Sequence, residues 1–504
     1  MVTSILEYLE ASASRSPDKA AFTDERGDIT YAALLSLARS IGTALAKRIE
    51  ARSPVAVLMD ARDARCVPAF LGAVYAGGFY APLDPAAPAD RLRLFLQTLK
   101  PAAMVYDHKY AGLAGGLMDA AGDIVSYDEL SEREAAPSIL EDARKRASVF
   151  DTLTVLFTSG STGAPKCVAH NHLAMINYTE ITNEVFGFTE DTVFGNQSPF
   201  FYANSIIDIY PPLALGASVN LLPASASSFP KRFVERLNSS RVTELTMTPS
   251  SYVHIANSGA LAAGALPRLR SVIMSGEAAP WRQVRQWMDA ANHAVFYNFY
   301  GSTEALPVAV YRIDRDFSDD EAIPVGRLYD RVHILFLDEN GGEAPMGEPG
   351  EIYVSSPWLS TGYYRDKARS DAAFVNDPLG RGCAERFYRT GDFGRVNARG
   401  ELVVLGRMDA QIKHWGYRME LGEVERALRG LHGWNDGCCL FDRRSGLVYC
   451  FWDGKLTERD IVSGLKVKLP KHMLPDRYIH LESVPYNANS KIDRSALRSR
   501  VTAP

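Results

Sequence analysis

The amino-acid sequence predicts an α/β fold in which parallel sheets are covered on both faces by helices. Helix-like and strand-like patterns alternate along most of the chain, as they do in βαβ units. After about Gly350 the strand-like runs become shorter and richer in glycine, which indicates a small β subdomain. The 504 residues, 46% of them apolar, suffice for large cores, and the length suggests about three domains.

The individual elements of this pattern can be placed in chain order. Thr30 is a suitable N-cap for a helix whose apolar face recurs at Leu34, Leu37, Ile41 and Leu45. A second helix should end at Gly77-Gly78. Buried strands are expected at residues 55–59, 80–85, 218–222 and 269–273.

Charge and composition exclude several classes of protein. The 55 basic and 60 acidic residues give a net charge of −5, so no nucleic-acid or membrane partner is indicated. Residues 1–10 carry acids within their apolar stretch, which predicts a capped helix rather than a signal peptide. No stretch approaches the roughly twenty apolar residues that span a bilayer. The six cysteines form no CxxC pair and are expected as reduced thiols. A cytoplasmic protein is therefore expected.

Residues 158–166 carry the strongest local signal for function. They read Thr-Ser-Gly-Ser-Thr-Gly-Ala-Pro-Lys and follow the strand-like run 153–158. Gly160 and Gly163 permit tight backbone turns, so that N–H groups, hydroxyls and Lys166 can surround phosphate oxygens. The spacing to the lysine and Cys167 after it exclude a Walker A loop. The loop predicts a nucleotide site; a plain Ser/Gly linker is the alternative.

This loop resembles the phosphate loop of adenylate-forming enzymes, a superfamily that includes acyl-CoA synthetases, luciferases and peptide-synthetase adenylation domains. Further segments match in the family's order: Asn298-Phe-Tyr-Gly-Ser-Thr-Glu304, Gly350-Glu-Ile, Tyr388-Arg-Thr-Gly-Asp392, Gly406-Arg-Met-Asp-Ala-Gln411, Gly416-Tyr-Arg-Met-Glu-Leu-Gly-Glu423 and Asn489-Ser-Lys491-Ile-Asp. The resemblance is strongest to stand-alone adenylation domains and D-alanine-carrier protein ligases. It implies an adenylation core over 1–408, a hinge at Asp409, and a small mobile α+β lid domain over 409–504.

The resemblance also assigns roles in ATP-dependent chemistry. In this family a carboxylate attacks the α-phosphate of ATP to give an acyl-adenylate, and a thiol then takes the acyl group. Lys491 would bridge carboxylate and ATP, and Glu304 would bind Mg²⁺ with help from Thr303 and Thr158, since hard cations prefer oxygen ligands. Gly416 would line the pantetheine channel. The expected nucleotide-binding residues are Thr158, Ser159, Gly160, Ser161, Thr162, Gly163, Lys166, Asn298, Tyr300, Gly301, Ser302, Asp392 and Arg407.

Four of these residues have a specific expected contact. Asp392 would accept the ribose hydroxyls, with Arg407 beside it. Tyr300 would stack on adenine, while Asn298 offers a paired donor and acceptor to the edge of the base.

The acid substrate should be selected by residues 201–210, where the family's amino-acid activators usually begin Phe-Asp. Here Ala203 replaces that Asp, and a buried ammonium without an anionic partner costs several kcal/mol. The substrate therefore lacks a normal α-ammonium, or Asn204 or another group has taken over; a one-residue slip in the alignment or an introduced Ala203 are the alternatives. The expected pocket is nearly all apolar and comprises Tyr202, Ala203, Asn204, Ile207, Met247, Ile273, Ser275, Phe299, Pro307 and Val308.

The predicted function is activation of a small carboxylic acid, an amino acid or an analogue, followed by transfer to a carrier protein's phosphopantetheine. No carrier motif is visible before Pro504, so the acceptor is expected in trans. An acyl- or aryl-CoA ligase is the first alternative. A non-catalytic nucleotide-binding protein is the second, and the presence of Lys166, Glu304, Asp392, Arg407 and Lys491 argues against it. The sequence does not determine the oligomeric state.

Overall fold

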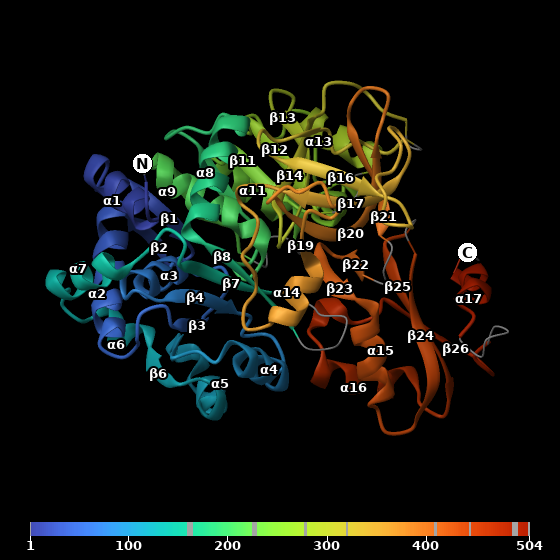
Figure 1. Ribbon diagram of the computed structural model, residues 1–504, viewed down its shortest axis with the longest axis horizontal. Coiled ribbons are helices and arrows are strands. Elements are labelled where there is room, and N and C mark those ends of the chain that lie inside the picture. Colours follow the sequence, from blue (N-terminus) through green and yellow to red (C-terminus); the bar gives the residue numbers. More distant parts are fainter. Residues whose placement is uncertain are drawn as a thin grey trace. The chain divides into compact units, whose positions relative to one another are not determined.

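The computed structural model describes residues 2–158, 165–223, 229–276, 280–318, 321–407, 411–442, 445–485 and 492–501. The chain divides into two compact units (Figure 1). Unit 1 comprises Met1–Pro85, Leu96–Phe157 and Cys167–Met408, and unit 2 comprises Ala86–Phe95, Thr158–Lys166 and Asp409–Pro504. Each unit is described by itself.

The largest sheet of unit 1 has nine described strands and is mostly parallel. Antiparallel pairs occur only toward its two edges, at β13–β14, β14–β15 and β1–β2. The strands lie in the order β15 (Arg327–Leu328), β14 (Leu306–Arg312), β13 (Val295–Ser302), β12 (Ser271–Ser275), β11 (Glu244–Met247), β9 (Val193–Asn196), β10 (Ser218–Leu221), β1 (Ala20–Asp24) and β2 (Gly27–Thr30).

A second sheet of unit 1 has seven described strands with a parallel centre. Its order is β18 (Gly362–Tyr363), β8 (Lys166–Asn171), β7 (Thr152–Thr158), β4 (Phe79–Leu83), β3 (Pro54–Leu58), β5 (Ala103–Tyr106) and β6 (Asp123–Ser126). These two sheets confirm the predicted α/β fold.

Helices bury apolar residues on both faces of the nine-stranded sheet. In β12 the side chains alternate: Ile273 belongs to one large apolar cluster, whereas Val272 and Met274 belong to another that includes Tyr252 and Trp287 of two helices. This alternation follows from the two-residue period of a strand. The helices before the β subdomain are α1 (Leu6–Arg15), α2 (Tyr31–Ala46), α3 (Cys66–Tyr75), α4 (Ala89–Leu99), α5 (Ala111–Gly115), α6 (Tyr127–Ser131), α7 (Pro137–Arg146), α8 (His172–Phe186), α9 (Tyr210–Leu215), α11 (Pro230–Ser239), α12 (Pro249–Asn257) and α13 (Trp281–Ala290).

The predicted local signals agree with these elements. Thr30 caps α2, because its Oγ1 accepts the Ala33 N–H at 3.2 Å. The N-terminal helix α1 begins at Leu6, and its capping contacts come from before Ile5, which offers none itself. The Ser4 hydroxyl accepts the Leu6 N–H at 3.3 Å, and the Thr3 hydroxyl donates to Glu7 Oε1 at 2.7 Å.

The predicted β subdomain is a largely antiparallel sheet within unit 1. It consists of β16 (His333–Leu337), β17 (Gly350–Ser355), β20 (Arg386–Val396) and β19 (Phe374–Asn376), with β21 (Leu402–Arg407) paired to β20 and helix α14 (Lys367–Ala373) before β19.

Unit 2 contains two small sheets with helices around them. The hairpin β22 (Gln411–His414) and β23 (Tyr417–Glu420) leads into α15 (Leu421–Arg429). A three-stranded sheet follows, formed by β24 (Trp434–Asp442), β25 (Leu447–Gly454) and β26 (Arg477–His480), with α16 (Glu458–Lys468) and α17 (Arg494–Val501). Its apolar cluster includes Val424, Leu428, Ile461 and Leu465.

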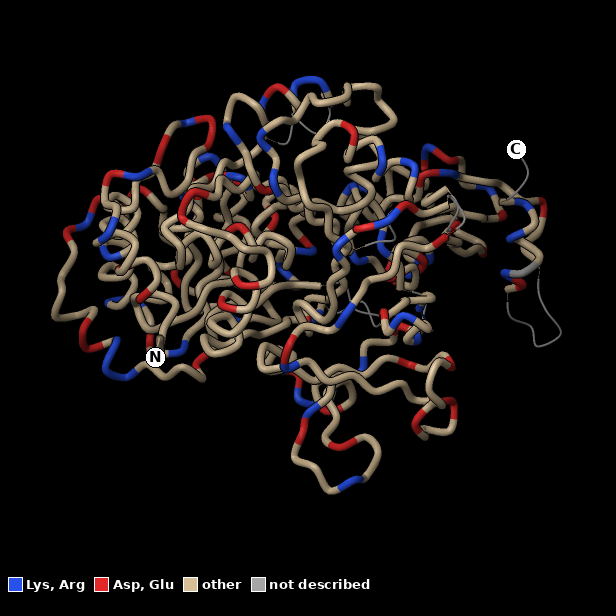
Figure 2. The backbone as a smooth tube through the Cα atoms, turned by 90° about the horizontal axis from the view of Figure 1, so that it is seen from above, with Lys and Arg blue, Asp and Glu red and all other residues tan. Residues whose placement is uncertain are grey.

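The charged residues are mixed in sign and the cysteines form no disulfide. Acidic and basic residues intermix along the backbone of each unit (Figure 2). All six cysteines are free, and five of them are buried. Among the described residues, no helix is long and apolar enough to cross a membrane.

Candidate active site

Three predicted nucleotide residues meet in unit 1, where the nine-stranded sheet and the β subdomain each contribute strands. Asp392 of β20 is paired in register with Arg407 of β21, and Tyr300 comes from β13. The Tyr300 hydroxyl donates to Asp392 Oδ2 at 2.6 Å, and Arg407 Nη1 donates to Asp392 Oδ1 at 2.8 Å. The side chain of Asp392, 13% exposed, thus receives a donor on each carboxylate oxygen and remains beside a fixed cation.

The protonation state of Tyr300 follows from its surroundings. Burial, and then the adjacent Asp392 carboxylate, raise the pKa of the phenol well above its ordinary value of 10.0. Tyr300 therefore stays a hydrogen-bond donor at neutral pH. Each carboxylate oxygen has two lone pairs, so Asp392 can still accept hydroxyl groups from a ligand. The stacking of the Tyr300 ring on adenine remains a prediction.

Asn298 lies two residues before Tyr300 on β13, and its side chain is buried in the protein. It is 3% exposed, and its Nδ2 donates to the carbonyls of Ile323 and Pro324 at 3.2 and 3.0 Å. The donor half of the expected contact with adenine is therefore used inside the protein. A buried amide must satisfy its N–H groups wherever carbonyls are nearest, and the motif alone does not reveal those carbonyls.

The turn after β13 holds the predicted catalytic carboxylate, Glu304. The Tyr363 hydroxyl donates to Glu304 Oε1 at 3.0 Å, and the Ser360 N–H donates to the Glu304 carbonyl at 2.8 Å. His170 Nε2 donates to the carbonyl of Thr303 at 2.8 Å, and burial lowers the pKa of His170 to about 4, so the ring is neutral. The Glu304 side chain is fully buried in this arrangement.

Gly301 and Ser302 have structural roles in the same turn. A Cβ on Gly301 would meet the Leu306 carbonyl oxygen at 2.0 Å, so no larger residue fits. Ser302 Oγ accepts the Ala305 N–H at 3.1 Å. These contacts explain how both residues shape the turn that carries Glu304, and their contact with nucleotide stays a prediction.

The phosphate-loop motif is only partly within the described chain. Thr158 ends β7 and Lys166 begins β8. Thr158 Oγ1 is buried and has no hydrogen-bond partner among the described residues. Ser159, Gly160, Ser161, Thr162 and Gly163 lie outside the described residues, as do Asp409 and Lys491.

In unit 2, Gly416 lies in the two-residue turn of the β22–β23 hairpin. Trp415 and Gly416 have φ values of 54° and 82°, as the central residues of a type I′ turn do. Trp415 Nε1 donates to Asp476 Oδ1 at 3.3 Å, and His414 Nε2 bonds Asp476 Oδ2 at 2.7 Å. Asp476 therefore supports a turn whose first residue is unusually bulky for positive φ.

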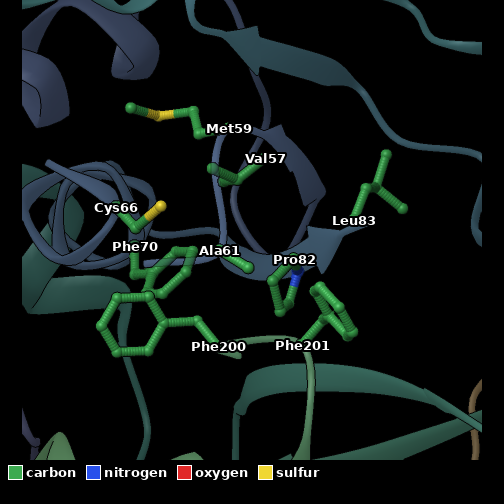
Figure 3. A pocket seen from close by; sticks show the side chains of 9 residues that line it. All are labelled: Val57, Met59, Ala61, Cys66, Phe70, Pro82, Leu83, Phe200 and Phe201. Atoms are coloured by element: carbon green, nitrogen blue, oxygen red, sulfur yellow. The ribbon is translucent and has the colours of Figure 1, made fainter. Parts of the chain in front are cut away.

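The segment predicted to select the acid is anchored in unit 1 by an apolar pocket. Phe200 and Phe201 line it with residues of β3, α3 and β4 (Figure 3). The rings of Phe200 and Phe70 meet edge to face, 5.8 Å apart, and the Phe200 N–H donates to the Ala61 carbonyl at 3.1 Å. This packing fixes the start of a 3₁₀ helix, η3 (Ala203–Asp208), which carries Ala203, Asn204 and Ile207.

Most of the remaining predicted pocket residues lie on adjacent strands of the nine-stranded sheet. Ile273 and Ser275 of β12 share a face, and Ser275 pairs in register with Phe299 of β13. Ile207, Ile273 and Val308 belong to one apolar cluster, against which Ala203 and Phe299 pack. Pro307 in β14 uses its carbonyl to accept the Trp358 indole N–H at 2.7 Å.

Met247 is the exception among the predicted pocket residues. It pairs in register with Met274 and packs in the second apolar cluster, on the opposite face from Ile273. Its neighbour Thr246 pairs with Ile273 and so lies on the Ile273 face. Because side chains alternate along a strand, Thr246 shares the face of Ile273 and Met247 does not; the role of Met247 in the pocket stays a prediction.

One polar pair lies within this apolar region. The Ser275 hydroxyl donates to Asn204 Oδ1 at 3.4 Å, and Ser275 is 4% exposed. Among the described residues, Asn204 makes no other hydrogen bond. Its Nδ2 group thus has both N–H donors available to a ligand.

Two fully buried carboxyl groups lie nearby in the fold, one on η3 with Asn204 and one on β11, the strand paired with β12. Asp208 ends η3 and accepts from Asn196 Nδ2 at 2.8 Å, while Glu244 begins β11 and accepts from Thr246 Oγ1 at 2.6 Å. Burial raises the pKa of Asp208 to about 7, and burial and then Asp208 raise that of Glu244 well above its ordinary range. Glu244 is therefore neutral at pH 7 and no anionic partner for a substrate ammonium.

Sequence reasoning missed His170, Tyr363, Thr246 and Glu244. His170 and Tyr363 contact the Glu304 turn from segments more than 50 residues away, so no local pattern reports them. A signal for Thr246 and Glu244 existed in the alternation of Glu-Leu-Thr-Met along β11, which places two polar side chains on one face.

Residues 9–364 match the family model described as AMP-binding enzyme. The chain belongs to this family, whose members use ATP, and it is an AMP-forming ligase. One relative is the D-alanine–D-alanyl carrier protein ligase of Bacillus cereus, 31% identical over 523 residues, covering 99% of this chain and 100% of the relative.

Solved structures of adenylation domains are also similar. Holo-PA1221, a nonribosomal peptide synthetase protein with adenylation and carrier domains, has a TM-score of 0.83 and 25% identity, with coverage of 99% of this chain and 84% of that one. The Vibrio cholerae adenylation domain AlmE, in complex with glycyl-adenosine-5′-phosphate, has a TM-score of 0.85 at 22% identity, covers 100% and 98% of the two chains, and shows the shared fold.

Proposed function

We propose that this enzyme uses ATP to convert a small carboxylic acid to an acyl-AMP and then transfers the acyl group to the phosphopantetheine thiol of a carrier protein in trans. In the first step a carboxylate oxygen attacks the α-phosphorus and pyrophosphate leaves. In the second, the thiol sulfur attacks the acyl carbonyl carbon, the thiol proton is lost, and AMP leaves.

The observation that carries the nucleotide part is the Tyr300–Asp392–Arg407 cluster. Asp392 offers oxygen acceptors at a fixed position, and its two donors hold both oxygens in place at 2.6 and 2.8 Å. Paired ribose hydroxyls are the ligand group that such a carboxylate fits. The name of the Bacillus cereus relative supports a carrier protein as acceptor.

The catalytic assignments remain part of this proposal. Lys491 would supply positive charge where the carboxylate meets the α-phosphate, and the loop 158–166 with Lys166 would hold the other phosphates. Residues 1–408 would form the adenylation core and 409–504 a lid that turns about Asp409 between the two half-reactions, with Gly416 beside the pantetheine.

Mg²⁺ fits the oxygen donors that the chain offers. In unit 1, Glu304 supplies a carboxylate that accepts from the Tyr363 hydroxyl. Thr158, assigned to unit 2, has a buried hydroxyl without a hydrogen-bond partner among the described residues, and its sharing of the ion is part of the proposal. No cluster of three or more His, Cys, Asp or Glu suited to a metal occurs in the described part of the chain. Such a donor set suits Mg²⁺, which keeps waters and substrate phosphates as ligands and would neutralise phosphate charge.

The test is a pyrophosphate-release screen of the full chain with amino, hydroxy, unsubstituted and aryl acids, followed by transfer assays. Mass spectrometry would compare a holo-carrier protein with free CoA as acceptor. We expect pyrophosphate release that depends on one class of acid, and thioester on the carrier protein. Efficient acylation of CoA with an unmodified carrier would instead support an acyl-CoA ligase, and no release with any acid would overturn the proposal.

A further inference from the structure

The Ser275–Asn204 pair determines which hydrogen-bonding groups the predicted acid-binding pocket presents. A carbonyl oxygen only accepts hydrogen bonds, so at the 3.4 Å contact with Asn204 Oδ1 the serine must donate. The amide is thereby oriented with Oδ1 toward Ser275 and Nδ2 elsewhere. Because no other described residue bonds Asn204, its two N–H groups are the polar function left for a ligand.

Among the described residues of η3, β11, β12 and β13, no carboxylate contacts Asn204. Ala203, which precedes it on η3, has no polar side-chain atom. Asp208 and Glu244 are the carboxyl groups on η3 and β11, and both are 0% exposed with Asn196 and Thr246 as partners. Ile207, Ile273 and Phe299 supply only apolar surface. An ammonium placed here would be desolvated opposite N–H donors, an arrangement that is strongly unfavourable.

We infer that the acid substrate carries a neutral oxygen acceptor near its carboxyl group, as a 2-hydroxy or 2-oxo acid does, and that Asn204 Nδ2 donates to this oxygen while Ser275 holds the amide in that orientation. This inference rests on the proposed function and adds the substrate class. Asn204 is then a specificity-determining residue, and Ser275 a positioning residue that acts through it.

The consequence for selectivity follows from the unpaired donor. A bound substrate without an oxygen at this position would leave the amide N–H groups unsatisfied, and sites built around a hydrogen bond reject such analogues strongly. A substrate with an ammonium would place its positively charged N–H groups opposite the N–H donors of Asn204, and the two would repel each other. The order expected for turnover is therefore oxygen-bearing acid first, unsubstituted acid second and amino acid last.

The experiment measures ATP–pyrophosphate exchange with matched sets of acids of three to six carbons. Each set holds the 2-amino, 2-hydroxy, 2-oxo and unsubstituted acid on one carbon skeleton, with both enantiomers where they exist. For the best skeleton we expect kcat/KM for the hydroxy or oxo acid to exceed that for the other two by at least roughly tenfold. The hydroxy and oxo arms identify which oxygen is preferred.

Two variants test the role of the amide. Asn204→Asp keeps the shape but replaces the donor by a carboxylate, so the ratio of hydroxy acid to amino acid should fall by at least roughly tenfold. Ser275→Ala releases the amide to turn its oxygen toward the ligand, and the same ratio should fall through KM while kcat for the unsubstituted acid changes little. Ser275→Thr, which retains the hydroxyl, should restore the preference.

Ser205→Ala is the matched control. It removes a nearby buried hydroxyl that bonds the Tyr202 carbonyl at 2.7 Å, and it should leave the ratio unchanged. The inference is overturned if the natural enzyme prefers the amino acid, or if Asn204→Asp leaves the ratio as it was. Exchange with none of the acids would overturn the proposed function itself, whereas exchange without discrimination would overturn only the substrate class.

Discussion

Replacing Asp392 by Asn should remove the discrimination of the enzyme between ATP and its deoxy analogues. The side chain keeps its size, but a carboxylate with two accepting oxygens becomes an amide with one. If the carboxylate accepts the ribose hydroxyls, each lost contact is a hydrogen bond to a charged group, worth about 1.5–3 kcal/mol. At 1.36 kcal/mol per factor of ten, one such contact changes kcat/KM by about tenfold to 150-fold.

The geometry of the cluster defines how this loss should be distributed. Tyr300 and Arg407 hold one oxygen each, so both oxygens are fixed in the unliganded enzyme. For the natural enzyme, kcat/KM should therefore be about tenfold to 150-fold lower with 2′-deoxy-ATP and with 3′-deoxy-ATP than with ATP. In Asp392→Asn the loss of kcat/KM with at least one of the two deoxy nucleotides should nearly vanish, because the variant already lacks the contact with that hydroxyl.

Pyrophosphate exchange with ATP, 2′-deoxy-ATP and 3′-deoxy-ATP measures this directly. Asp371→Asn is the control, since it removes one acidic charge from exposed α14, where Asp371 pairs with Lys367. Thermal unfolding checks that each variant folds. Equal use of the three nucleotides by the natural enzyme, or an equal loss with all three in Asp392→Asn, would refute the assignment of Asp392 to the ribose.

Three further predictions concern the lid and the buried acids. Lys491→Ala should reduce acyl-adenylate formation by far more than tenfold, while thioester formation from a preformed adenylate persists; a loss within about tenfold contradicts its role. Asp409→Pro should retain pyrophosphate exchange but slow thioester formation, because proline restricts φ at the hinge; equal effects on both half-reactions would exclude a two-state lid. Glu244 has a raised pKa when folded, so its contribution to stability is greatest below the pKa of the unfolded chain and declines as pH rises. Between about pH 5 and 8, the free energy of unfolding of Glu244→Gln should therefore fall less steeply than that of the natural enzyme. Urea unfolding at several pH values measures this, and the same pH dependence in both proteins would contradict it.

The fold was largely predictable because its signals are local. The cap at Thr30 and the apolar spacing of α2 depend on neighbouring residues, and the alternation of elements is enough to indicate parallel sheets. The parts of the site that depend on which face of a strand a side chain occupies, or on contacts between distant segments, were harder to predict from the sequence. The packing of Met247 opposite Ile273, for example, follows from the strand register, because a strand reverses its side-chain direction at every residue.

Long-range pairing limited the remaining predictions. The hydrogen bond of Ser275 to Asn204 joins residues 71 positions apart, and nothing in either local segment reveals it. The same holds for the carbonyls of Ile323 and Pro324 that take up the Asn298 amide. The motifs identified which residues matter, whereas the direction of each polar side chain required the folded chain.

The indole of Trp415 provides an optical reporter within unit 2. The chain has six tryptophans, and Trp415 is 50% exposed, whereas Trp281, Trp287, Trp358 and Trp452 are each less than 9% exposed. A small soluble quencher such as iodide therefore reaches Trp415 much more readily than those four. Its ring sits on the turn next to Gly416 and is tethered to Asp476, so fluorescence quenching follows the surroundings of that turn without an attached dye.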